Sequence, residues 1–391
     1  MTGLITKLTQ KIDGWKQEVQ QLVKTSGNIK VSDVTVSQLY GGMRGIKSLS
    51  CDTSVVPDDQ GLIIRNYFLK DLTEYLPEEI FYLLLTGELP TPTELTEFQT
   101  ELKSRKNVPN YVWDVLKAMP SDSHPMAMLS AALLSMQKES VFAKSYEKGC
   151  KKDEYWKHTL DDSMNIVAKL PGISAAIYRL RFNKGELIQP DPDMDFTSDF
   201  LYMMGLDHKN TEIYNLFRLY LVCHCDHEGG NVSSLTSATV NSALSDLYYS
   251  MSAGFNGLAG PLHGRANQEC IDWIIKLNQK YNGVPTKEDL IQFVTETLKA
   301  GKVIPGYGHA ILRIVDPRFE AFMKYGNKYC ADEPIFQSVK LVFETVPDIL
   351  KTIEKIKDPW PKIDAISGAL LYHYGVREFL YYTNIFALSR A

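Results

Sequence analysis

Apolar residues recur at the three- and four-residue spacing of an amphipathic helix along nearly the whole chain. The first such stretch would place these residues on one helix face: Ile5, Leu8, Ile12, Trp15, Val19 and Leu22. Similar patterns predict helices near 92–106, 124–138, 153–170, 194–205, 209–224, 233–256, 265–280, 287–299, 317–325, 335–356 and 366–389. The dominance of this one period predicts an all-α fold.

Only residues 27–68 have an extended pattern. Runs rich in β-branched and apolar residues cover Ile29–Val36 and Leu49–Val56, and the turn-forming residues 57–61 then lead into Leu62–Arg65. This segment predicts one small antiparallel β element near the N-terminus. Strands and helices do not alternate elsewhere, which argues against a parallel nucleotide-binding sheet.

Composition narrows the class of protein. The chain has 391 residues, a formal net charge of −5 and an ordinary hydrophobic content of 44%. No bulk positive charge indicates a nucleic-acid partner, and no apolar run reaches the length that membrane insertion requires. The six cysteines are irregularly spaced, which does not indicate a disulfide framework and favours a reducing compartment.

A cysteine- and histidine-rich run at 223–227 invites a comparison with metal sites. Its potential ligands, Cys223, Cys225 and His227, would spread around a helix rather than converge on one point. We therefore expect buried thiols here and no metal site.

Three histidines stand in contexts rich in glycine or proline. His227 precedes Gly229 and Gly230, while His263 and His309 lie in the runs Gly260–Gly264 and Pro305–His309. Glycine allows close backbone approach to a ligand, so such histidines are candidates for a binding site. Together with one later carboxylate and two arginines they predict acid–base chemistry on an anionic substrate: Asp364, Arg318 and Arg390.

Four ordered segments resemble citrate synthase, most closely the eukaryotic mitochondrial type: 226–231, 256–269, 303–319 and 364–368. The resemblance runs from about Val31 to the last residue. It implies condensation of acetyl-CoA with oxaloacetate, hydrolysis of citryl-CoA, entry of carbon into the tricarboxylic acid cycle, no cofactor besides the CoA substrate, and residence in the mitochondrial matrix.

The resemblance also implies catalytic roles. Asp364 would abstract a proton from the thioester methyl group, and His263 would donate a hydrogen bond to the developing enolate oxygen. A helix predicted to start at 265 disfavours an imidazolium at His263, so that residue would act as a neutral donor. Ser233 would orient His263, and His309 would protonate the ketone of oxaloacetate.

Substrate binding is implied for two further groups of residues. The oxaloacetate or citrate carboxylates would contact His227, Arg318, Arg390 and Asn231, since arginine meets carboxylates bidentately. The CoA moiety would contact the glycine-rich loop and several cations: Arg44, Lys152, Val303, Ile304, Pro305, Gly306, Tyr307, Gly308, Arg313 and Lys362. Lys152 stands where the family has an arginine, and so would bind phosphate without the arginine fork.

The family pattern implies a large helical domain, 1–265 plus 375–391, with a smaller inserted domain, 266–374. The site would lie between them in a homodimer, with oxaloacetate binding first. The family continues beyond the position of Ala391 with a tail arginine that enters the partner subunit's site, so we expect a truncated chain.

Two alternatives stay open. One is 2-methylcitrate synthase, which uses propionyl-CoA, because one methylene is a small difference for a binding pocket to detect. The other is a structural or filament-forming protein on the same fold. Retention of Asp364, His263 and His309 argues against loss of catalysis.

Overall fold

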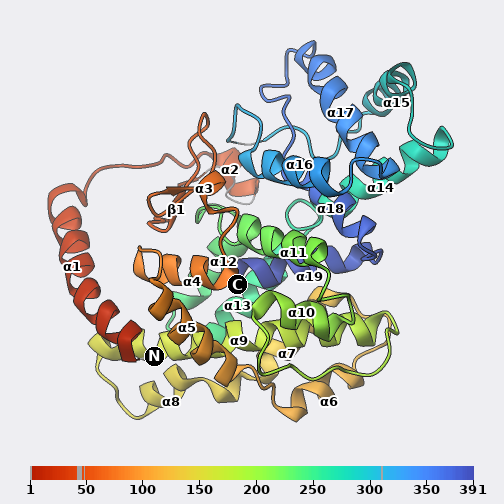
Figure 1. Ribbon diagram of the computed structural model, residues 1–391. Helices are drawn as coiled ribbons and strands as arrows, with labels where there is room; N and C mark the ends of the chain where they lie inside the picture. Colours follow the sequence, from red (N-terminus) through yellow and green to blue (C-terminus); the bar gives the residue numbers. More distant parts are fainter. Residues whose placement is uncertain (1, 42–45, 48, 310) are drawn as a thin grey trace.

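The fold is helical almost throughout, as predicted (Figure 1). The computed structural model describes residues 2–41, 46–47, 49–309 and 311–391. Within these residues no helix is both long and apolar enough to span a membrane. The N-terminal helix α1, Thr2–Ser26, lies at one edge of the molecule and buries only Leu4 and Leu8, which belong to a small apolar cluster with Tyr82 and Phe98.

The predicted antiparallel sheet is present but small. Strands β1 (Ser54–Val55), β2 (Ile63–Ile64) and β3 (Tyr67–Phe68) pair in that order, with Val55 opposite Ile63 and Ile64 opposite Tyr67. The expected strand at Ile29–Val36 is wrong. The chain there has no sheet partner, and a capping box between Thr35 and Gln38 begins a short helix, α2, Val36–Tyr40.

The helices that follow the sheet build most of the body. Their bounds are α3 Leu69–Leu72, α4 Pro77–Thr86, α5 Pro92–Arg105, α6 Asn110–Ala118, α7 Pro125–Ser135, α8 Val141–Glu147, α9 Tyr155–Arg181, α10 Phe196–Met204, α11 Thr211–His224, α12 Val232–Asn241 and α13 Leu247–Leu258. The stretch 233–256, predicted as one helix, is two. The break falls at 242–246, where Asp246 caps α13 and Leu244 has a positive φ of 60°.

The last helices carry most of the site. They are α14 Ala266–Lys280, α15 Lys287–Lys299, α16 Pro317–Tyr329, α17 Pro334–Lys351, α18 Asp364–His373 and α19 Tyr382–Arg390. The single helix predicted over 366–389 is again two, α18 and α19. They are separated by a turn in which Gly375 has a φ of 91°.

One continuous apolar cluster runs from Val56 to Leu388 and contains the largest buried rings, such as Phe200, Phe217 and Phe322. Helix α11 lies in the middle of the molecule and packs on α16, α18 and α19 (Figure 1). The helices of residues 266–374 therefore share their core with the rest of the chain. Division of the chain into two domains at 265/266 and 374/375 stays a prediction.

Candidate active site

Charges from two helix ends link the predicted site residues. The guanidinium of Arg318, in the first turn of α16, acts on the pKa values of His227, His309 and Asp364. That of Arg390, at the end of α19, acts on those of His227, His263 and Asp364. Two arginines from different helices thus share one set of titratable groups.

His263 lies in the turn before α14. Its backbone N–H donates to Gly260, and the following residue, Gly264, donates to Leu258. Burial, together with the charge of Arg390, lowers the pKa of His263 to about 4. The ring is therefore neutral at physiological pH.

Ser233 fixes one nitrogen of that ring. Its Oγ lies 2.9 Å from Nε2 of His263 and 2.7 Å from Oδ1 of Asn231. That Asn231 oxygen also accepts the backbone N–H of Ser234, at 3.0 Å, and so caps helix α12. The Ser233 hydroxyl has one hydrogen, which it donates to Asn231, so Nε2–H of His263 donates to Ser233 Oγ in this arrangement. Nδ1 of His263 carries a hydrogen only when the Ser233 hydroxyl turns to donate to Nε2.

His309 has its own tautomer fixed by the backbone. Nδ1 accepts the N–H groups of Ile311 at 3.0 Å and Leu312 at 2.9 Å. Nδ1 must therefore be unprotonated, and the ring hydrogen is on Nε2. Burial, then the charge of Arg318, lowers the pKa of His309 to about 4. This histidine is also a neutral hydrogen-bond donor.

His227 lies on the loop after α11, and its ring centroid is 5.6 Å from that of His309. Burial, with Arg318 and Arg390, lowers its pKa well below the usual value. Its Nε2 atom is buried and has no partner among the described residues. A buried polar atom without a partner destabilises the fold, so a ligand group that hydrogen-bonds to this atom would offset that loss.

Arg318 is held rigidly by Asp316. Nε of Arg318 lies 3.0 and 3.1 Å from the two Asp316 carboxylate oxygens, and Nη2 lies 2.7 Å from Oδ2. Both side chains are almost fully buried. Nη1 has no partner in the described part of the chain, so this side of the fork can meet a substrate carboxylate.

Arg390 is fixed through its Nε atom, which donates to the carbonyl oxygen of His224 at 2.6 Å. Its guanidinium also lies 4.9 Å from the ring of Phe386. Neither Nη atom has a partner among the described residues. Burial lowers the pKa of Arg390 to about 10, which leaves the group charged at neutral pH.

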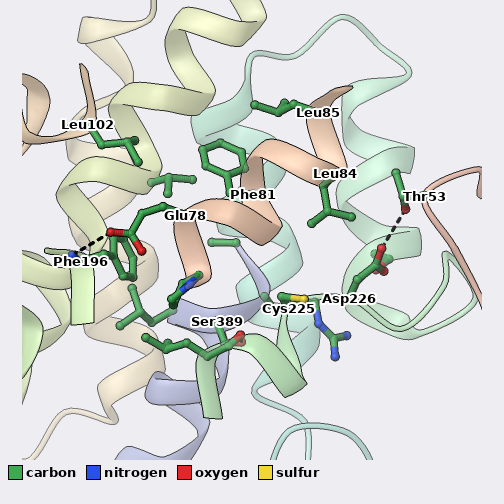
Figure 2. A pocket seen from close by; sticks show the side chains of 17 residues that line it. Thr53, Glu78, Phe81, Leu84, Leu85, Leu102, Phe196, Cys225, Asp226 and Ser389 are labelled. Carbon is green, nitrogen blue, oxygen red and sulfur yellow. Dashed lines mark hydrogen bonds between the residues drawn. The ribbon is translucent and has the colours of Figure 1, made fainter. Parts of the chain in front are cut away.

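A cavity of about 350 Å³ lies next to the guanidinium of Arg390 (Figure 2). Apolar side chains that include Phe81, Leu84 and Leu85 line most of it. Polar groups lie at its edges, where Thr53 donates to Asp226 at 2.9 Å and the backbone of Phe196 donates to Glu78 at 3.2 Å.

Asp364 is the first residue of α18 and is partly buried. Burial raises its pKa, against the opposing charges of Lys362 and Arg318. Within the described ranges its carboxylate accepts no hydrogen bond and forms no ion pair. A carboxylate with a raised pKa and no fixed partner is suited to take a proton.

The glycine-rich loop 303–309 is joined to the segment before α18. The N–H of Gly308 donates to Trp360 at 3.1 Å, and that of Lys362 donates to Gly306 at 2.8 Å. Gly306 has a φ of 79°, and a Cβ there would lie 2.8 Å from both Cys270 Sγ and Ala365 Cβ. Only glycine can hold the loop this close to α14 and α18.

The other residues predicted to contact CoA do not form one cluster in the structure. Val303 is exposed, whereas Ile304 is buried. The Arg313 guanidinium lies over its own loop and donates to the carbonyls of Ile311 at 2.9 Å and Leu312 at 2.7 Å. Lys152 is exposed in a short 3₁₀ helix before α9, and in the described parts of the chain its side chain has no hydrogen bond to the loop. Arg44 lies outside the described residues. These CoA contacts stay predictions.

Two features of the site escaped the sequence analysis. Asp316 is the first, although its position two residues before Arg318 could have indicated an ion pair within the first helical turn. Tyr220, which stacks on His224 at 3.9 Å, gave no signal because a tyrosine on an apolar helix face is ordinary core. Cys223 and His224 are buried in the core, and the described residues contain no cluster suited to hold a metal ion.

Comparisons with known proteins agree with this arrangement. The family model described as "Citrate synthase, C-terminal domain" matches residues 42–391. The chain is 42% identical to a mitochondrial 2-methylcitrate synthase of Yarrowia lipolytica, over 100% of this chain and 86% of that protein. It is 42% identical to the peroxisomal citrate synthase of Saccharomyces cerevisiae (96% and 83% covered). It is 41% identical to the mitochondrial citrate synthase of the same yeast (96% and 80% covered).

Among solved structures, a citrate synthase from Pyrobaculum aerophilum superposes with a TM-score of 0.81. It is 28% identical and covers 90% of this chain and 86% of its own.

Proposed function

This chain belongs to the citrate synthase family, and on that basis we propose that its site condenses acetyl-CoA with oxaloacetate and hydrolyses citryl-CoA to citrate and CoA. The observation that carries the proposal is the set of ionisation states. Two neutral histidines, His263 and His309, act beside an unpaired carboxylate, Asp364, under the charges of two arginines.

Enolisation is the first demand. Asp364 takes a proton from the thioester methyl, and its raised pKa makes it a stronger base than an exposed carboxylate. With the Ser233 hydroxyl turned to donate to Nε2, 2.9 Å away, His263 donates its Nδ1 hydrogen to the developing enolate oxygen. The negative charge that moves from the carboxylate to the enolate oxygen is thus stabilised by a positioned hydrogen-bond donor rather than by water.

Condensation needs an acid on the other substrate. The enol carbon attacks the ketone carbon of oxaloacetate as His309 donates its Nε2 hydrogen to the ketone oxygen. Nδ1 of His309, held by two backbone N–H groups, keeps the ring in the donor tautomer throughout. The two oxaloacetate carboxylates bind the free fork of Arg318 and the free end of Arg390, and His227 Nε2 provides a third contact.

CoA binding is proposed at the loop 303–308, with Arg44, Lys152, Arg313 and Lys362 near its phosphates. The backbone of this loop is hydrogen-bonded to the segment that precedes Asp364, the first residue of α18. This connection supports the proposal, because a loop that binds CoA would then bring the thioester to the base.

The test is release of free CoA thiol after mixing the protein with oxaloacetate and acetyl-CoA. Asp364→Asn should lower kcat by about 10²- to 10⁴-fold, the usual contribution of a general base. Asp332→Asn, a matched change at an exposed aspartate, should leave kcat unchanged. A folded wild-type protein that releases no thiol would refute the proposal and favour a structural protein.

Propionyl-CoA defines the second candidate function. A 2-methylcitrate synthase relative is as similar to this chain as the citrate synthases are. The same assay with propionyl-CoA separates the two, because one methylene changes kcat/KM by about 10- to 200-fold in a fitted pocket. We expect acetyl-CoA to be preferred by a factor in this range.

We further propose a homodimer located in the mitochondrial matrix, in which the family's shared site would form. Exposed apolar residues on and beside α12 and α13 support an interface there: Val232, Leu244 and Tyr249. Sedimentation should give twice the chain mass of 44.3 kDa. Protease protection in purified mitochondria checks the location, and recovery in peroxisomes would contradict it.

A further inference from the structure

Helices α14 and α18 pack closely at Asn267 and Gly368, both of which are buried. A Cβ added to Gly368 would lie 2.2 Å from Oδ1 of Asn267 and 3.2 Å from its carbonyl oxygen. At such distances a side chain at position 368 requires Asn267 or one of the helices to shift. The α-hydrogen of Gly368 points at the amide oxygen instead, a weak contact that lets the helices touch.

The two residues occupy matching places. Asn267 follows His263 by four residues, and Gly368 follows Asp364 by four residues. Four residues are about one helical turn. Gly368 therefore lies one turn beyond Asp364 in α18, whereas Asn267 lies in the first turn of α14 and His263 in the turn that precedes this helix. The distance between Asn267 and Gly368 sets how far apart the starts of α14 and α18 are.

Neighbouring groups hold both sides of this contact. The Asn267 amide donates to the hydroxyl of Tyr220 at 3.5 Å. The Tyr382 hydroxyl lies 3.3 Å from the carbonyl of Gly368, and the Thr383 hydroxyl donates to the carbonyl of Gly264 at 3.0 Å. Two consecutive residues of α19 thus brace one carbonyl next to His263 and another on α18.

We infer that Asn267 and Gly368 are positioning residues, whose close contact sets the separation of the His263 ring from the Asp364 carboxylate. The inference rests on the proposed function for the roles of those two groups. Neither positioning residue belongs to the set proposed to touch substrate. Their effect comes through helix spacing, and a displacement of about 1 Å in a catalytic pair costs on the order of 100-fold in rate.

The test is a size exchange across the contact. Gly368→Ala should lower kcat for citrate formation by about 100-fold and change the KM for oxaloacetate by less than about twofold. Asn267→Ala should cost no more than about tenfold. The double variant should match Asn267→Ala, because the small side chain leaves room for the new methyl. Gly172→Ala, in α9 with no atom closer than 3.6 Å to its new Cβ, is the matched control with no expected loss.

A deuterium isotope effect separates positioning from general damage. With trideuterated acetyl-CoA, Gly368→Ala should show a larger effect on kcat than wild type, since proton abstraction becomes slower. A partly unfolded sample would lose rate with an unchanged isotope effect. If Gly368→Ala does not fold, Asn267→Ala must itself show a lowered kcat and a raised isotope effect.

Losses that multiply in the double variant, or single variants with the wild-type rate and isotope effect, would overturn the inference alone. A wild-type protein without activity would overturn the proposed function as well, so the two failures are distinguishable.

Discussion

Replacing Asp316 by asparagine removes the negative charge that holds Arg318 and leaves the shape of the side chain nearly unchanged. The carboxylate caps α16, accepting the N–H of Arg318 at 3.0 Å, and forms three further contacts of 2.7 to 3.1 Å with the guanidinium. Asparagine caps a helix as well as aspartate does, so the cap survives. The buried guanidinium then lacks its hydrogen-bonded opposite charge, and removal of one member of such a pair costs about 3–5 kcal/mol.

The free energy of unfolding in urea measures this cost. Asp246→Asn is the matched control, since Asp246 is a buried helix cap with a neutral partner, Gln137. It should lose no more than about 1 kcal/mol. Adding Arg318→Met to Asp316→Asn should restore most of the loss, because no buried charge then lacks a partner. A loss below about 1 kcal/mol in Asp316→Asn would refute the reasoning.

The pH dependence provides an independent check. Burial alone would raise the pKa of Asp316, but the adjacent Arg318 brings it below the usual value. A depressed folded-state pKa gives stability that is complete above the unfolded pKa of about 3.9 and is lost as pH falls through the folded pKa. The difference in stability between wild type and Asp316→Asn should therefore shrink below about pH 4.

Three further outcomes are expected. Ser233→Ala removes the hydroxyl that orients the enolate donor, so kcat should fall by about 10- to 100-fold, equivalent to 1–3 kcal/mol, and Ser233→Thr should keep most of the rate. In a pH–rate profile, kcat should fall with acid as Asp364 takes up one proton at a pKa above its usual value, while His309, with a pKa of about 4, stays neutral; a limb of slope two near pH 6 would contradict this. Gly306→Ala and Gly308→Ala share a φ near +80° and its strain of about 1–2 kcal/mol, but only Gly306→Ala meets close neighbours and should lose about 1–3 kcal/mol more; equal losses in urea would exclude the packing argument.

Helix boundaries were predictable where local chemistry marks them. Asp316 before Pro317 starts α16 as expected, because a cap and a ring-fixed φ act within two residues. The break between α12 and α13 is marked locally only by Asp246, the cap of α13, and the left-handed φ of Leu244 has no sequence signal. Conversely, α9 continues through Pro171, whereas the low helix propensity of proline predicts that the helix ends there. The strand expected at Ile29–Val36 failed because pairing depends on a partner that no local pattern reveals.

The identities of the candidate site residues were predictable, but not their mutual support. Motifs in the sequence indicated His263, His309 and Asp364. In the structure, Arg390 acts on the pKa of His263, Arg318 acts on that of His309, and both act on that of Asp364. The backbone donors that fix the His309 tautomer, and the fit of Asn267 against Gly368, depend on distances of a few tenths of an ångström. Such distances follow from packing and have no counterpart in residue spacing.

The hydrogen bonds between loop 303–309 and residues 358–363 have a consequence for how this enzyme could be altered. Gly308 is tied to Trp360 and Gly306 to Lys362, so the segments that carry His309 and Asp364 form one backbone unit. A substitution, engineered or natural, that moves one of these groups therefore moves the other as well. New acyl substrates would consequently be gained more readily through substitutions outside this backbone unit.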